Sequence, residues 1–236
     1  MTGEFAGANS LKSSAGAELA ADAELSTTIG VIDYGMGNRR SVQKALEHVG
    51  ARAPVTGDPE ELRRCAGLVL PGVGAFPAAM RNLRRLGLDG LVRQADQPLL
   101  GVCLGMQLLF DRSDELEPAE GLGLIPGTVT PLNTGGLRVP HIGWNEVRFE
   151  RLSPLTAGLP ETGCPFYHVH SFAVRPTDSA DVIGTSEYGE RFATVVQRGS
   201  VFGVQFHPEK SSAFGLAMLE NFVAHCREPS RAALPA

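Results

Sequence analysis

The side chain best suited to covalent chemistry in this sequence is Cys103, within the segment GVCLGMQ at residues 101–107. The segment has the form G-x-C-x-G and joins an apolar run to an amphipathic one, which is the cysteine version of a nucleophile elbow. A sharp strand-to-helix turn strains the backbone at the cysteine, so Gly101 and Gly105 must lack side chains that would clash. The turn also sets the thiol at a helix N-terminus, where the positive end of the helix dipole favours the thiolate. We therefore predict that Cys103 is a nucleophile.

The alternative for Cys103 is a buried core cysteine, which is a common role for free cysteines. The other three cysteines, Cys65, Cys164 and Cys226, lie in no comparable pattern and are assigned to packing or to the surface. None of the four forms a C-x-x-C pair, and their spacings match no zinc site. A chain of 236 residues needs no disulfides for stability, so the cysteines indicate a reducing, cytoplasmic setting.

A nucleophilic cysteine needs a base, and the base needs a partner that fixes its tautomer. The segment GVQFHPE at residues 203–209 supplies both. An alternating strand ends at His207, Pro208 stops further pairing, and Glu209 can reach the ring nitrogen that faces away from the thiol. A lone histidine at a strand end is more often a satisfied surface or core residue. Together with the cysteine elbow, however, the pattern predicts a triad of Cys103, His207 and Glu209.

The composition is that of an ordinary globular protein, with 43% hydrophobic and 20% charged residues. The formal net charge of −5 argues against a nucleic-acid-binding footprint, which is basic and clustered. No apolar run reaches the length needed to cross a bilayer. The sequence therefore predicts neither a nucleic-acid partner nor a membrane location.

Strand, loop and helix alternate along the first half of the sequence. Apolar and β-branched runs predict the strands, and stretches with apolar residues on one face predict the helices between them. This order predicts a parallel sheet covered on both faces by helices. The predicted strands are 27–33, 67–70 and 98–102, and the predicted helices are 39–49, 76–86 and 104–110.

The second half is punctuated by Pro, Gly and β-branched runs, which predict short strands between residues 127 and 183. We therefore expect an α/β fold, a three-layer sandwich in which helices flank a central, mostly parallel mixed sheet. Residues 27–228 form one domain in this prediction, between a flexible N-terminal extension at 1–26 and a disordered tail at 229–236. The remaining predicted elements are strands at 182–186, 192–197 and 200–206 and a last helix at 213–226.

Several segments give the sequence a family resemblance. GVCLGMQ and FHPE resemble the class I, triad-type glutamine amidotransferases, whose fold is flavodoxin-like. The resemblance narrows with DYGMGN at 33–38, PGVGAF at 71–76, PHIGWN at 140–145 and the segment 203–211. These are similar to the glutaminase subunits of imidazole glycerol phosphate synthases, enzymes of histidine biosynthesis. The resemblance runs from about Ile29 to the final helix and leaves only the two ends of the chain uncovered.

This resemblance implies an activity and a partner. The family hydrolyses glutamine to glutamate and ammonia through a cysteine thioester. The ammonia passes to a (β/α)8-barrel cyclase subunit in a heterodimer, which makes imidazole glycerol phosphate and aminoimidazole carboxamide ribotide. Neither a metal nor an organic cofactor is expected in this subunit.

The implied chemistry needs two backbone donors for a tetrahedral oxyanion. One should be the N–H of Leu104, next to the nucleophile, and the other the N–H of Val73, in the glycine-rich loop 71–74. The alternative for that loop is a tight turn without a catalytic role.

The resemblance also implies a pocket for glutamine, in which Glu115 would receive the α-amino group. The alternative for Glu115 is a solvated position in the acidic run 111–117. The predicted substrate-binding residues are Gly74, Gln107, Glu115, His170 and Ser171.

A partner at the mouth of the site would contact segments rich in Gly, aromatic and amide residues. We expect three such segments, all in loops, at 34–38, 140–145 and 167–170. Trp144 is the only tryptophan of the chain, and its alternative role is packing in the core. The predicted interface residues are Asn38, Pro140, His141, Trp144, Asn145 and Tyr167.

Two positions depart from the pattern of the family. His168 replaces a more usual aromatic residue, and Arg39 stands where an apolar residue is common. Neither belongs to the predicted triad, so they bear only on the rim of the pocket and on the partner surface.

Three other functions stay open at this point. The chain could be the glutaminase of another class I amidotransferase, a stand-alone cysteine hydrolase, or a non-enzymatic binding protein. The PHIGWN and DYGMGN segments argue against the first, and the intact triad argues against the last. A stand-alone hydrolase would differ in needing no partner for its full rate.

Overall fold

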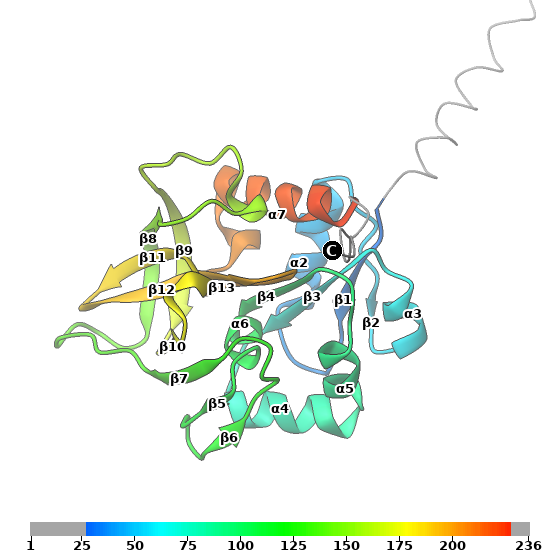
Figure 1. The fold of residues 1–236 in the computed structure, drawn as a ribbon, viewed down its shortest axis with the longest axis horizontal. Coiled ribbons are helices and arrows are strands. Elements are labelled where there is room, and N and C mark those ends of the chain that lie inside the picture. The colour runs from blue at the N-terminus through cyan, green and yellow to red at the C-terminus, as the bar shows by residue number, and fades with distance from the viewer. Residues whose placement is uncertain (1–26, 228–236) are drawn as a thin grey trace, which may run out of the picture.

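A mixed sheet forms the centre of the computed structural model, which describes residues 27–227 of the chain (Figure 1). Its central strands run in the order β2-β1-β3-β4-β13, and every neighbouring pair among them is parallel. Every residue of β1, β3 and β4 is buried, as expected for strands covered on both faces. The bounds are β1 Ile29–Ile32, β2 Val55–Thr56, β3 Gly67–Gly72, β4 Leu99–Cys103 and β13 Val201–Val204.

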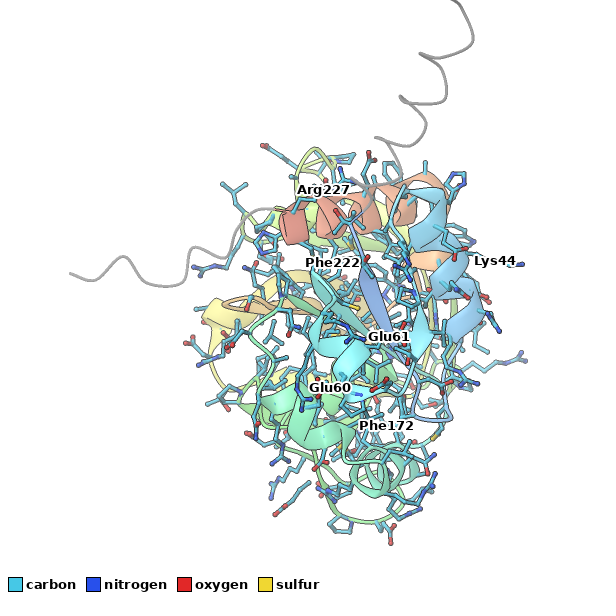
Figure 2. All side chains as sticks on the ribbon, turned by 90° about the vertical axis from the view of Figure 1, so that its right-hand side faces the viewer. Lys44, Glu60, Glu61, Phe172, Phe222 and Arg227 are labelled. Carbon is cyan, nitrogen blue, oxygen red and sulfur yellow. The ribbon has the colours of Figure 1, made fainter. Side chains whose placement is uncertain are left out.

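Helices cover both faces of this parallel region (Figure 1). On one face lie α2 (Arg39–His48) and α7 (Ser212–Arg227), whose inner residues, such as Leu46 and Phe222, belong to one hydrophobic cluster. Figure 2 shows Lys44 of α2 pointing away from the sheet, as its exposure requires. A second cluster includes inner residues of α3 (Pro59–Arg63), α4 (Phe76–Arg85), α5 (Leu88–Arg93) and α6 (Leu104–Leu108).

Antiparallel strands extend the sheet beyond β13. In order they are β12 (Glu190–Arg198), β10 (Phe172–Pro176) and β7 (Gly127–Pro131), and β7 pairs in parallel with the short β5 (Arg112–Ser113), which pairs with β6 (Ala119–Glu120). A branch leaves β12 through β11 (Val182–Tyr188), β8 (His141–Phe149) and β9 (Cys164–His170). Three short 3-10 helices, η1 Pro154–Thr156, η2 Ser179–Asp181 and η3 Pro208–Lys210, complete the part that the structure describes.

The predicted fold class is confirmed: a parallel central sheet, which includes the last strand β13, lies between helices, and antiparallel strands extend it beyond β13. The predicted extension at 1–26 and tail at 229–236 lie outside the described residues. Within residues 27–227, no helix is long and apolar enough to span a membrane.

One expectation is wrong. The segments 140–145 and 167–170 were expected in loops, but residues 141–145 lie in β8 and residues 167–170 lie in β9, and these strands pair from His141↔His170 to Val147↔Cys164. Burial alternates along β9, with buried residues at every second position from Cys164 to His170. This period of two is the signature of a strand with one covered face, and it was hidden by the Gly, Pro and polar residues of the two segments.

The turn between β4 and α6 explains the G-x-C-x-G pattern. Cys103 has φ 55° and ψ −112°, a strained conformation for a residue with a side chain. A Cβ atom on Gly105 would lie 1.8 Å from the carbonyl oxygen of Leu70, and one on Gly101 would lie 2.7 Å from the oxygen of Gly105. The helix therefore packs against β3 and β4 through backbone contacts that only glycine permits.

We predict that Gly105→Ala lowers the free energy of unfolding by about 3 kcal/mol, because the new methyl group overlaps the backbone of β3. The matched control is Gly90→Ala in α5, where an added Cβ meets no atom within 4 Å. That change should raise stability by up to about 1 kcal/mol, through helix propensity alone. Chemical denaturation of the two variants compares them, and equal effects would contradict the close contact.

Candidate active site

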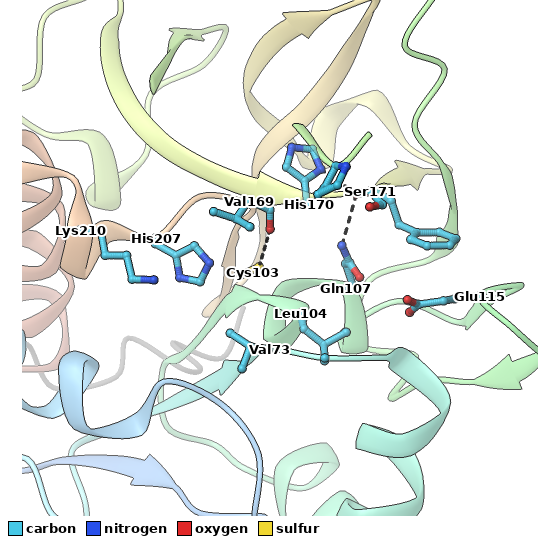
Figure 3. A pocket seen from close by; sticks show the side chains of 13 residues that line it. Val73, Cys103, Leu104, Gln107, Glu115, Val169, His170, Ser171, His207 and Lys210 are labelled. Carbon is cyan, nitrogen blue, oxygen red and sulfur yellow. Dashed lines mark hydrogen bonds between the residues drawn. The ribbon is translucent and has the colours of Figure 1, made fainter. Parts of the chain in front are cut away.

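A cavity of about 300 Å³ opens where β3 and β4 end (Figure 3). This volume is at the small end of the range for ligand sites, and it suits a substrate the size of an amino acid. In Figure 3, His207 and Lys210 lie on one side of Cys103, and Gln107 and Glu115 lie on the other. The predicted site residues that line it are Val73, Gly74, Cys103, Leu104, Gln107, Glu115, His170, Ser171 and His207.

The thiol of Cys103 lies in this cavity, although the residue is largely buried. It donates to the carbonyl oxygen of Val169 on β9, with a sulfur–oxygen distance of 3.7 Å. The side-chain amide of Gln205 donates to the sulfur over 3.8 Å. Sulfur hydrogen bonds are long and weak, so these contacts orient the thiol without holding it tightly.

His207 follows β13 and is buried with its partner Glu209. Its Nδ1 lies 2.9 Å from Oε1 of Glu209. Because a carboxylate only accepts, Nδ1 carries a hydrogen, and Nε2 is the nitrogen left to exchange a proton with Cys103. Two backbone contacts hold the residue: its N–H donates to the carbonyl of Tyr167 over 2.9 Å, and its carbonyl accepts from Ser211 Oγ over 2.6 Å.

Burial alone would lower the pKa of His207. The hydrogen bonds and charges of Cys103 and Glu209 act in the opposite direction and outweigh burial, so the pKa is raised to about 9. The imidazolium is therefore the stable form of this side chain at neutral pH. That is the behaviour required of a group that must hold a proton during a reaction.

Asn38, predicted at the partner interface, also contacts the triad. Its Nδ2 donates to Oε1 of Glu209 over 3.0 Å. The other carboxylate oxygen, Oε2, is buried and has no hydrogen-bond partner within residues 27–227. Asn38 therefore helps to hold the carboxylate in the orientation that His207 needs.

A buried hydrogen bond holds the end of β3, which leads into the loop that carries Val73. The buried Tyr34 hydroxyl donates to the carbonyl oxygen of Pro71 over 2.8 Å, and burial raises the pKa of this phenol, so it stays protonated. Gly74 has φ 112°, a conformation that favours glycine. A Cβ at Gly72 would lie 2.7 Å from the backbone nitrogen of Gly105, so this loop packs directly on the start of α6.

The predicted glutamine pocket has polar groups of fixed orientation. Oε2 of Glu115 accepts from the backbone N–H of Phe76 at the start of α4, over 2.8 Å. Nε2 of Gln107 donates to the carbonyl of Phe172 over 3.3 Å and to Oε1 of Gln205 over 3.0 Å. Nδ1 of His170 donates to the same Phe172 carbonyl over 2.9 Å, and burial lowers the pKa of this histidine to about 4.

The residues predicted for the interface fall into three groups. Trp144 is 55% exposed and packs edge-on against Tyr167, with ring centroids 6.1 Å apart, so it does not pack in the core. Pro140 lines the cavity. Asn145 donates a hydrogen bond to the Glu187 carbonyl over 2.8 Å. His141 is only 3% exposed, so the interface role predicted for it does not fit its buried position.

Within residues 27–227, the two departures from the family pattern, His168 and Arg39, make no hydrogen bond to the triad. His168 is fully buried, donates from Nδ1 to the Phe166 carbonyl over 3.1 Å and pairs with Thr194 over 2.9 Å. It is a satisfied core histidine and not part of the pocket rim. Arg39 forms an ion pair with Asp33 at the start of the 34–38 loop.

Four lining residues were not predicted as site residues, or not for this role: Pro140, Val169, Phe172 and Lys210. Gln205 was missed as well. Its signal was its place two residues before His207, which puts both side chains on the same side of an extended segment. Lys210 directly follows the His-Pro-Glu turn, and this proximity in sequence was the only sign of it.

Comparison with known proteins agrees with this geometry. Residues 30–226 match the family "Glutamine amidotransferase class-I". The chain is 52% identical over 197 residues to the imidazole glycerol phosphate synthase subunit HisH of Moorella thermoacetica, a match covering 82% of this chain and 93% of that protein. It is 53% identical over 205 residues to the protein of the same name in Geobacillus thermodenitrificans, covering 84% and 95%. The chain belongs to the HisH group of the class I glutamine amidotransferases.

Two solved structures share the fold. A structure described as a putative GMP synthase component from Thermoplasma acidophilum aligns with a TM-score of 0.67 at 19% identity, over 85% of this chain and 94% of that one. A second, described as a glutamine amidotransferase, aligns with a TM-score of 0.64 at 22% identity, over 84% and 98%. The chain thus shares its overall fold with proteins of low sequence identity.

We predict that Glu209→Gln lowers the pKa of His207 from about 9 towards its ordinary range, because the substitution removes the charge that stabilises the imidazolium. The pKa is raised in the folded state, so the charged His207 stabilises the fold fully below about pH 6.5, and this contribution is lost as the pH rises through about 9. NMR titration of the ring resonances measures the change. Glu150→Gln, at a carboxylate paired with Arg191 outside the cavity, is the matched control and should leave the titration of His207 unchanged.

Proposed function

We propose that this chain hydrolyses glutamine to glutamate and ammonia, and supplies the ammonia to a (β/α)8-barrel cyclase. The observation that carries the proposal is the meeting, in one small cavity, of a cysteine on a strained elbow with a buried His207–Glu209 pair. The names of the HisH relatives support the same assignment.

The reaction begins when the sulfur of Cys103 attacks the side-chain amide carbon of glutamine. His207 takes the thiol proton, and its raised pKa favours holding it as the imidazolium until the leaving nitrogen needs it. The C–N bond breaks, ammonia departs with that proton, and a glutamyl thioester remains. Water then cleaves the thioester, which releases glutamate and restores the thiol. Glu209 keeps the ring in the orientation that both steps require.

Two backbone N–H groups, of Leu104 and Val73, would stabilise the tetrahedral oxyanion. Leu104 begins α6 directly after the nucleophile, and Val73 lies on the neighbouring loop that lines the same cavity. Losing one such donor typically lowers the rate by about 100- to 1000-fold. Glu115 and Gln107 lie across the cavity from His207, where they suit the α-amino end of the substrate.

The proposed partner is the cyclase subunit of an imidazole glycerol phosphate synthase, which makes imidazole glycerol phosphate and aminoimidazole carboxamide ribotide. An exposed apolar patch of Val139, Ile142 and Trp144 on and before β8 supports a docking face, since Pro140 between them lines the cavity. The proposed location is the cytoplasm, which is supported by four free thiols.

Control by the partner would act on the oxyanion loop. Val73 stands between glycines and its side chain is 43% exposed, so its peptide has little to hold it in one orientation. A liganded partner that favours the orientation with the N–H towards the oxyanion would raise the rate. A thousandfold gain needs about 4 kcal/mol of differential stabilisation.

We predict weak glutamine hydrolysis by the isolated chain and strong activation when the barrel partner and its nucleotide ligand are both present. Ammonia release is measured with the chain alone, with the partner, and with the liganded partner. Cys103→Ala should abolish the activity, whereas Cys65→Ala, the same change at a buried thiol outside the cavity, should retain it. Equal rates under all three conditions would identify a stand-alone hydrolase, and hydrolysis by Cys103→Ala would refute the thioester.

A glutamine analogue that carries a diazoketone should label Cys103 alone. Burial raises the pKa values of the other three thiols, with Cys164 at about 11 and Cys226 at about 12, so they stay protonated and unreactive at neutral pH. Peptide mapping by mass spectrometry locates the label. Modification of Cys65, Cys164 or Cys226 before Cys103 would contradict the assignment.

A further inference from the structure

Two buried amide side chains connect the backbone of β10 to the sulfur of Cys103. The carbonyl oxygen of Phe172 accepts from Nε2 of Gln107 over 3.3 Å. The same nitrogen donates to Oε1 of Gln205 over 3.0 Å, and Nε2 of Gln205 then donates to the sulfur over 3.8 Å. The path therefore runs from a fixed carbonyl, through two carboxamides, to the nucleophile.

The direction of every bond on this path is determined by its first member. A backbone carbonyl can only accept, so the atom of Gln107 that faces Phe172 must be the nitrogen. Both hydrogens of that nitrogen are then used, and the atom of Gln205 that faces it must be an oxygen. The remaining end of Gln205, which faces the sulfur of Cys103, is consequently an N–H donor.

The two amides have little freedom to leave this arrangement. Gln205 has no exposed surface and Gln107 is 5% exposed. The backbone N–H of Gln205 donates to the carbonyl of Thr194 on β12 over 2.9 Å, which continues the pairing of β13. Gln107 is fixed by its place in α6 and by its hydrogen bond to the Phe172 carbonyl. A reversed amide would set two acceptors or two donors face to face in a buried site.

We propose that Gln205 is a further catalytic residue of the glutaminase reaction: its side-chain N–H donates to the sulfur of Cys103, and its oxygen holds Gln107 with the carbonyl end open to the substrate. The proposal rests on the proposed function. A donor aimed at the sulfur stabilises the negative charge that the sulfur carries when it attacks. A contact that is long before the substrate binds tightens when that charge develops.

The test uses Gln205→Glu, which keeps the shape and the oxygen that faces Gln107 but replaces the N–H donor with a negatively charged oxygen. Alkylation of Cys103 by iodoacetamide at pH 7 should fall by about tenfold, because a carboxylate beside the sulfur disfavours the thiolate. In the partner-activated glutaminase assay, kcat should fall by about tenfold or more while KM changes less than about threefold, since Gln107 keeps its orientation.

The matched control is Gln197→Glu on β12. Among the described residues 27–227 this side chain bonds the carbonyl of Gly199 alone, and it lies outside the cavity, so the same change of charge should leave the alkylation rate and kcat unaltered. Circular dichroism and thermal melting establish that each variant is folded.

A second variant, Gln205→Met, keeps the length of the side chain without charge or hydrogen bonds. It should slow alkylation of Cys103 and, because Gln107 loses its partner, raise KM as well as lower kcat. If Gln205→Glu does not fold, Gln205→Met alone tests the proposal.

Wild-type rates of alkylation and hydrolysis in the folded variants would overturn the proposal. Absence of hydrolysis by the wild-type chain with its liganded partner would instead refute the proposed function, while the alkylation rates still test the contact with the sulfur.

Discussion

The close approach of α6 to β3 is the contact on which the rest of the site depends. Gly105 lies so near the Leu70 carbonyl that no side chain fits between them. The chain can therefore turn from β4 into α6 within one residue, and the strain of that turn falls on Cys103. The same turn sets the first N–H groups of α6 beside the thiol. A looser helix would relieve the strain, but it would withdraw the nucleophile and its nearest backbone donors from the cavity together.

Around this turn, buried polar groups are oriented by backbone atoms rather than by solvent. The Phe172 carbonyl accepts from Gln107 and from His170, and the Pro71 carbonyl accepts from Tyr34. Backbone carbonyls are held by the sheet and cannot change from acceptor to donor. Side chains bonded to them therefore have one stable orientation each. The ionised pair of the triad, His207 with Glu209, lies beside these neutral groups.

The sequence was most informative where chemistry and local geometry coincide. The elbow glycines, the His-Pro-Glu turn and the buried parallel strands each depend on neighbours within a few residues, so they could be predicted. Strands β8 and β9 could not, because their pairing joins residues 17 (Val147↔Cys164) to 29 (His141↔His170) positions apart and their composition resembles that of loops. The contact of Asn38 with Glu209 joins residues 171 positions apart in the sequence, so no local sequence pattern predicts it. The burial of His141 likewise follows from the sheet and not from its own segment.

Strand β9 carries a consequence for how accurately the reacting groups are placed. The carbonyls of Tyr167 and Val169 are two residues apart, so they point to the same side of the strand. One accepts the backbone N–H of His207 and the other accepts the thiol of Cys103. The base follows β13 and the nucleophile ends β4, yet both are hydrogen-bonded to the backbone of the same strand, β9. The position of the base and the orientation of the thiol therefore both depend on the backbone of one short strand.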